Sequence, residues 1–167
     1  MPRPALLVAI TLPLLLAVTL AAVAITARIR DTAEPDAGPL PVAHVDAPDA
    51  TGPECTALLA ALPDELPGTG GPLPARPLAE PAPAGVRAWA AAPAPVVLRC
   101  GLPRPLELTP TSLLLEVDGV SWLPLADGAT YIAVDRPVFV ALTVPGSTGT
   151  GPLQVVSEAV RATLPPP

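Results

Sequence analysis

The stretch SLLLEVDGVSWL, residues 112–123, decides the fold of this 167-residue chain. An Asp-Gly pair at 118–119 separates two apolar runs, and a type I′ turn needs positive φ at both central residues. Before the turn, Leu113, Leu115 and Val117 alternate with other residues and share one face. The stretch therefore predicts a β-hairpin and, with it, an antiparallel sheet.

Further strands are predicted on both sides of this hairpin. A short β-branched run at 96–100, VVLRC, is closed by a glycine, and residues 130–134 form another candidate strand. In residues 138–144 the apolar side chains recur with period two, which predicts one shared face. That face consists of Val138, Val140, Leu142 and Val144.

Two helices are predicted to pack on the sheet. Residues 51–54, TGPE, fit a capping box in which Thr51 is the N-cap and Glu54 reaches back, with proline in the first turn. An apolar stripe follows it, formed by Cys55, Leu58, Leu59 and Leu62, and Pro63 ends the helix. A second stripe at helical spacing is formed by Leu153, Val156, Val160 and Leu164. The predicted fold class is α+β.

Residues 63–95 contain nine prolines. Proline lacks the amide donor and fixes φ, so neither a helix nor an inner strand is expected there. We predict an irregular loop that Trp89 pins to the core. The alternative is a polyproline ligand for a partner domain.

Cys55 and Cys100 are the only cysteines. In an exported domain such a pair predicts a disulfide, here joining the first helix to the strand at 96–100. Closing this loop restricts the unfolded chain by about 4 kcal/mol in the chain-entropy model. A redox role would favour a Cys-x-x-Cys spacing, and a structural zinc would need four ligands.

Residues 4–27 contain no charge, and about 20 apolar residues suffice to span a bilayer. We predict a single-pass transmembrane anchor over residues 1–30. The alternative is a signal peptide cleaved after Ala22-Val23-Ala24. Arginines flank the run on both sides and give no orientation by the positive-inside rule, whereas the cysteines favour an extracytoplasmic C-terminal domain.

Residues 31–50 mix acids, proline and alanine, and predict an extended, solvated tether that contains the single histidine, His44. The extracytoplasmic domain is expected over residues 51–165. Residues 31–167 hold six arginines against fifteen acidic residues, with no lysine. This charge excludes a nucleic-acid partner and predicts repulsion from an anionic membrane surface.

Several short motifs resemble the actinobacterial domain-of-unknown-function 3515 family, and the resemblance covers roughly residues 48–165. It is carried by Cys55-x-x-Leu58-Leu59-x-Ala61-Leu62-Pro63, Trp89, Leu98-Arg99-Cys100-Gly101, Gly119-Val120-x-Trp122-Leu123, Arg136-Pro137-Val138 and Pro152-Leu153. It implies a membrane-associated protein of a high-GC Gram-positive bacterium and no particular activity. The proline-rich insert at 67–84 departs from the family pattern.

The first functional hypothesis is a non-catalytic cell-envelope module that binds a protein or wall component. Trp89, Arg99 and Trp122 are its candidate binding face. The opposing interpretation places both tryptophans in the core, because the chain has only two other aromatic residues. A second hypothesis is a subunit of a membrane complex, whose contacts the anchor makes.

A third hypothesis is a cell-envelope hydrolase or transferase. It requires paired acids or an activated nucleophile. Asp118, Asp127 and Asp135 lie in or beside predicted turns, where aspartate is favoured for backbone reasons. The serines lack a plausible base, because lysine is absent and His44 lies in the tether. The sequence predicts no catalytic residue, no metal site and no cofactor.

Overall fold

A computed structural model describes residues 15–23 and 38–167 of the chain. The chain divides into two units, Met1–Glu34 and Pro35–Pro167. In the first unit, residues 15–23 are helical. Within the described parts of the chain, no helix combines the length and apolarity needed to cross a membrane. The rest of the predicted anchor and the start of the predicted tether, residues 1–14 and 24–37, lie outside the described residues.

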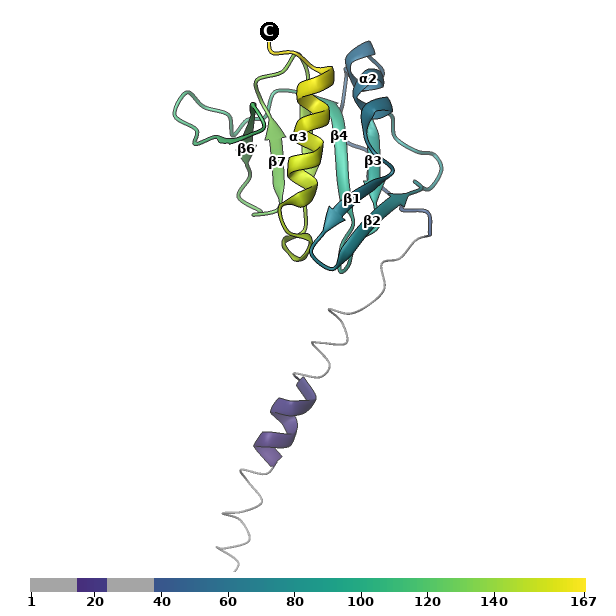
Figure 1. Cartoon of the computed structure of the whole chain (residues 1–167), viewed down its shortest axis with the longest axis vertical. Coiled ribbons are helices and arrows are strands. Elements are labelled where there is room, and N and C mark those ends of the chain that lie inside the picture. The colour runs from purple at the N-terminus through teal and green to yellow at the C-terminus, as the bar shows by residue number, and fades with distance from the viewer. Residues whose placement is uncertain (1–14, 24–37) are drawn as a thin grey trace, which may run out of the picture. The chain divides into compact units, whose positions relative to one another are not determined.

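The second unit is an antiparallel sheet of eight strands with two α-helices, α2 and α3 (Figure 1). The strand order is β1-β2-β3-β4-β8-β7-β6-β5. In chain order the elements are α2 (Pro53–Ala61), β1 (Glu65–Gly68), β2 (Gly71–Arg76), β3 (Val86–Trp89), β4 (Val96–Leu102), β5 (Leu115–Val117), β6 (Val120–Pro124), β7 (Thr130–Ala133), β8 (Phe139–Thr143), a 3-10 turn (Gly146–Thr148) and α3 (Gly151–Thr163). The predicted α+β class is confirmed for this unit.

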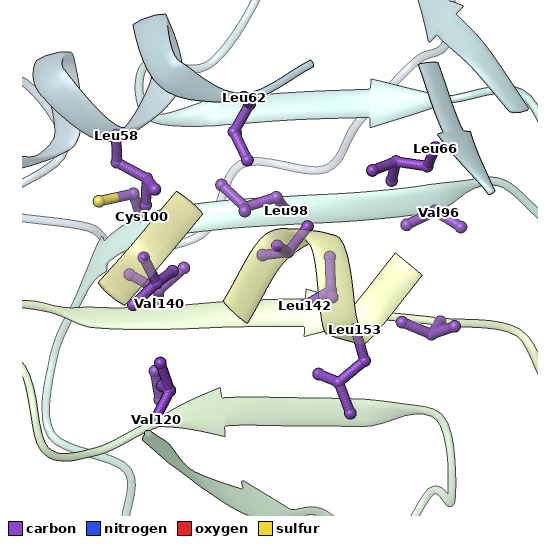
Figure 2. Packing of buried hydrophobic residues seen from close by; sticks show 14 of the residues in the cluster. Leu58, Leu62, Leu66, Val96, Leu98, Cys100, Val120, Val140, Leu142 and Leu153 are labelled. Carbon is purple, nitrogen blue, oxygen red and sulfur yellow. The ribbon is translucent and has the colours of Figure 1, made fainter. Parts of the chain in front are cut away.

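The main core lies between the two helices and one face of the sheet (Figure 2). The four residues predicted to share a face around β8 are all buried in it, and so is the predicted stripe of α3. Period two in the strand and period 3.6 in the helix therefore identified both faces correctly. The disulfide is also confirmed: Cys55 of α2 is bonded to Cys100 of β4, with the two Cα atoms 5.6 Å apart.

The hairpin at 118–119 has the predicted turn. Val117 pairs with Val120, and the two residues between them have positive φ, 51° at Asp118 and 74° at Gly119. The first strand is shorter than expected, because β5 begins only at Leu115. Leu113 lies in the preceding loop, and the face predicted to hold it is largely exposed.

The proline-rich segment 63–95 is not an irregular loop, because it contains β1, β2 and β3. In the β1–β2 register Pro67 pairs with Pro72, and Glu65 pairs with Pro74. The amide of Ala75 donates to the carbonyl of Asp64, so these two residues are a hydrogen-bonded pair. Hydrogen-bonded and non-hydrogen-bonded pairs alternate along an antiparallel ladder, so the two pairs that contain proline are non-hydrogen-bonded. Prolines thus occupy positions where this ladder needs no amide donor, and the strands form despite them.

The N-terminus of α2 also differs from expectation. The N-cap is Gly52, without a side-chain cap, so the predicted capping box with Thr51 and Glu54 is wrong. The amide of Gly52 bonds to the carbonyl of Asp49, which closes a turn directly before the helix. That turn moves the helix start one residue downstream, while Pro53 occupies the first helical turn as predicted.

Residues 38–50, which the sequence assigns to the tether, run along the domain and bond to it. Leu40 forms a parallel bridge with Leu78, and the amide of Asp49 donates to the carbonyl of Gly101. Gly101 has φ +85°, and a Cβ there would lie 2.3 Å from the Ala50 nitrogen. Only glycine allows this close approach of two backbones.

Candidate functional site

Both tryptophans of the predicted binding face are fully buried. The Trp89 indole Nε1 donates to the Pro63 carbonyl at 3.0 Å. The Trp122 indole Nε1 donates to Ser157 Oγ at 2.8 Å, and that hydroxyl donates to the Leu153 carbonyl. Each indole therefore joins a helix or its end to the sheet, which is the position that the core interpretation predicts.

Arg99, the third residue of that predicted face, lies in β4 between Leu98 and Cys100, both of which are in the main core. Because side chains alternate along a strand, Arg99 points to the opposite face of the sheet, where it is half-buried. Burial lowers the pKa of its guanidinium. The structure thus separates Arg99 from both tryptophans, and the three do not form one surface.

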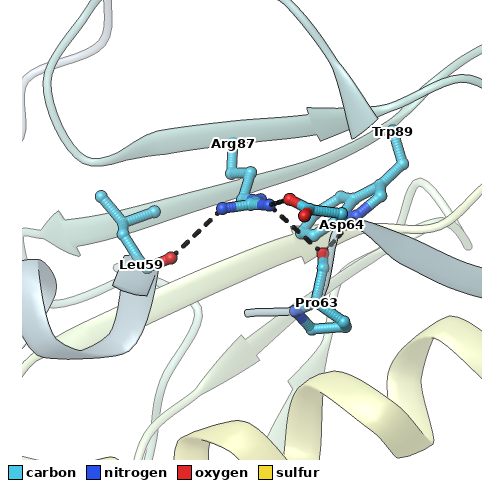
Figure 3. A network of polar contacts seen from close by, with 5 residues as sticks. All are labelled: Leu59, Pro63, Asp64, Arg87 and Trp89. Atoms are coloured by element: carbon cyan, nitrogen blue, oxygen red, sulfur yellow. Dashed lines mark hydrogen bonds and ion pairs between the residues drawn. The ribbon is translucent and has the colours of Figure 1, made fainter. Parts of the chain in front are cut away.

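Arg87 forms a polar network that sequence reasoning missed (Figure 3). Its guanidinium donates to the Leu59 carbonyl at 3.3 Å and to Asp64 Oδ1 at 2.6 Å, and it lies 5.7 Å from the centre of the Trp89 ring. A cation that binds the last carbonyls of a helix also complements the helix dipole. Arg87 therefore closes the end of α2 through its two terminal nitrogens, while its buried Nε has no hydrogen-bond partner among the described residues.

Two hollows lie near the β2–β3 connection. One, of about 280 Å³, has Arg76 and Arg87 as its only charged lining residues. The other, of about 500 Å³, lies between residues 41–44 and 79–84 and has His44 and Glu80 as its ionisable residues. Neither lining contains serine, threonine or cysteine, so neither pairs a nucleophile with a base. Among the described residues, no three metal-binding side chains cluster together.

An exposed group of leucines forms the most distinctive surface of the domain. Leu106 and Leu113 are 95% and 88% exposed, and Leu114 and Leu115 are 46% and 44% exposed. We call these four residues the leucine edge. They lie in β5, the last strand of the sheet, and in the loop before it, which projects from the side of the sheet in Figure 1. Leu113, Leu114 and Leu115 are consecutive, and several exposed apolar side chains close together on a folded domain favour an interaction site.

The sequence contained the signal for this surface, but the pattern predicted a different role. The residues before the Asp-Gly turn predict a strand in which Leu113, Leu115 and Val117 share one face, and they predict no binding role. Three successive leucines cannot all lie on one face of a strand, since side chains alternate. That run was the available sign that some of these leucines face outward.

Residues 9–167 match the family described as "Protein of unknown function (DUF3515)", and the chain belongs to that family. The match confirms the resemblance that the ordered motifs of the sequence indicate. No curated protein and no solved structure matches the chain.

Proposed function

We propose that this member of the DUF3515 family is a membrane-anchored, extracytoplasmic module that binds an envelope protein or a cell-wall component without catalysing a reaction. The leucine edge carries the proposal. Its four side chains are exposed on a domain that buries both of its tryptophans and Leu153 of α3. Exposed aliphatic area of this kind is stabilised when a partner covers it.

The place of the leucine edge in the fold suits a module at the end of a tether. Leu40, near the start of the described domain, bonds beside β2 at one end of the sheet. The strand β5 is the edge at the other end, with five strands between it and β2. The described residue Leu40 therefore joins the domain beside β2 and not at the β5 edge.

The extracytoplasmic location rests on two features of the chain. The uncharged run at 4–27 is long enough to anchor the protein, and the Cys55–Cys100 disulfide is typical of oxidising compartments. Alkaline phosphatase fused after Ala50 is expected to be active. An inactive fusion, with an active cytoplasmic reporter at the same position, would reverse the proposed topology.

The binding role is tested by photo-crosslinking in native membranes. A photoreactive amino acid at Leu113 is expected to give a discrete adduct with one envelope component. The matched control is the same probe at Glu158, an exposed residue of α3. Equal adducts from both positions, or none from Leu113, would contradict the proposal.

The alternative is a subunit of a membrane complex that makes its contacts through the anchor. The observation that favours it is the exposure of the apolar side chains of the helical residues 15–23. In the same crosslinking series, a probe at Val18 would then give the adduct and a probe at Leu113 would not.

A further inference from the structure

We propose that the outer edge of β5 binds an extended segment of a partner protein as a ninth strand, and that this segment alternates aliphatic and basic side chains. The inference rests on the proposed function and specifies how the leucine edge would recognise its partner. Strand addition provides affinity through main-chain hydrogen bonds and specificity through alternate side chains.

The hydrogen-bond register shows which main-chain groups of β5 are directed outward. Opposite Glu116 in the hairpin lies Ser121. The amide of Ser121 donates to Asp135 Oδ2 and its carbonyl accepts from the Val134 amide, so both groups point away from β5. Ser121 and Glu116 are therefore a non-hydrogen-bonded pair, and the amide and carbonyl of Glu116 point away from β6.

The side chains along this edge define the chemistry of the partner. Leu115 lies opposite the buried Trp122 and continues the helix-covered face of the sheet to its rim. Glu116 lies on the other face, and Asp118 follows in the turn. Within β5, an added strand would thus meet the aliphatic side chain of Leu115 on one face and the carboxylate of Glu116 on the other. An apolar and basic alternation complements both.

Edge protection explains part of this arrangement but not all of it. Short strands and central charges discourage unwanted pairing, and β5 has three residues with Glu116 in the middle. A purely protective edge would not gain from exposed leucines, which raise its tendency to associate. Leu113 and Leu115 are therefore assigned to recognition, and Glu116 selects for basic partners.

The probe for this inference is a blocked ten-residue peptide of alternating valine and arginine. It is titrated into the full chain in neutral detergent micelles, and binding is followed by anisotropy of a fluorophore on the peptide. The control peptide has the same sequence but carries N-methyl groups on all of its internal amides, so neither of its edges can donate to a ladder. The N-methylated peptide is expected to bind at least about tenfold more weakly.

Two variants at one position distinguish the contribution of the main-chain amide to peptide binding from that of the carboxylate. Glu116→Pro removes the outward amide but no hydrogen bond of the β5–β6 ladder, whereas Glu116→Gln removes only the carboxylate. We expect a loss of about tenfold for Glu116→Pro and about threefold for Glu116→Gln. Equal losses would overturn the inference. If Glu116→Pro fails to fold, the two peptides on the unmodified protein decide the question.

The remaining outcomes are also decisive. Equal binding of the two peptides, or no binding of either, overturns strand addition, while an adduct from the Leu113 probe would still support the proposed function. Loss of that adduct alone would instead overturn the proposed function. Concentration-dependent dimers that Glu116→Pro abolishes would overturn the partner assignment, because a second copy of the chain would then occupy the edge.

Discussion

The two hairpins at opposite ends of the sheet differ in a simple way: the hairpin with the stronger sequence signal is the more exposed of the two. The β5–β6 hairpin has the stronger turn signal, yet Leu115 in its outer strand is 44% exposed. The β1–β2 hairpin is rich in proline and gives no strand signal, yet Leu66 and Leu73 are only 1% and 8% exposed. Turn chemistry therefore determines where a hairpin forms, and the neighbouring elements determine whether it is covered.

The physical cause lies in the position of the helices. Helix α3 packs more extensively against β1 than against β5. The Cys55–Cys100 bond ties α2 to β4, and β1 and β2 lie within the loop that it closes. The β1–β2 hairpin thus depends on tertiary constraints, whereas the β5–β6 hairpin depends on its own turn.

Removing the disulfide should have the largest effect, and it should destabilise the β1–β2 hairpin more than the β5–β6 hairpin. The double variant Cys55→Ala/Cys100→Ala should lower the free energy of unfolding by about 4 kcal/mol, because the bonded residues are 45 apart in sequence. Urea unfolding measures the loss, and hydrogen exchange should show β1–β2 amides losing protection before those of β6. An unchanged unfolding midpoint would contradict the prediction.

Truncating one leucine in each hairpin gives the next largest difference. Leu66→Ala should cost about 3 kcal/mol, because it leaves a cavity in the main core. The matched change Leu115→Ala should cost less than about 0.5 kcal/mol, since that side chain is largely exposed in the free protein. Both losses are measured by chemical denaturation under oxidising conditions. Similar losses of unfolding free energy in the two variants would show that the two leucines are equally buried by their neighbours, which would contradict the prediction.

A smaller effect is expected from the turn that the sequence identified. Gly119→Ala should cost about 1 kcal/mol, because φ is +74° there and a Cβ is disfavoured in that region. The added Cβ itself would lie 3.7 Å from the nearest atom of Arg161, an ordinary contact. Gly70→Ala, in the connection between β1 and β2, meets no atom within 4 Å and should be nearly neutral. Thermal unfolding of both variants would reveal any reversal of this order.

The smallest effect should be a pH dependence in the β6–β7 turn. The Thr130 hydroxyl, then the amides of Ala129 and Thr130, lower the pKa of Asp127 by bonding to its carboxylate. A carboxyl whose pKa is lower in the folded state adds stability above its unfolded pKa of about 3.9 and loses it as pH falls through the folded value. Asp127→Asn should therefore be less stable than the parent at pH 6.

The difference in stability between Asp127→Asn and the parent should shrink below about pH 4, where the carboxyl of the unfolded chain begins to protonate, and vanish as pH falls through the lower folded pKa. Unfolding midpoints at a series of pH values measure it. Asp135→Asn is not a suitable control, because Asp135 also pairs with Arg136. Glu158→Gln, at an exposed position of α3, is measured beside Asp127→Asn as the control for the loss of one negative charge. A gap independent of pH would contradict the account.

The sequence by itself determined the features that depend on local geometry or on simple counting. The Asp118-Gly119 turn, the alternation in β8 and the stripe of α3 each follow from a fixed spacing of side chains along one element. The Cys55–Cys100 pairing follows because there is no third cysteine. The ordered motifs were also enough to identify the family.

Only the tertiary structure decided which surfaces are covered. Periodicity shows that residues share a face, but it does not show whether another element packs on that face. Consequently the tryptophans considered for binding lie in the core, and the leucines predicted to share one face of the hairpin strand are exposed at β5. The proline-bearing strands were missed for a related reason. Proline is excluded only where a ladder needs its amide, and the register that decides this forms only when β1, β2 and β3 come together.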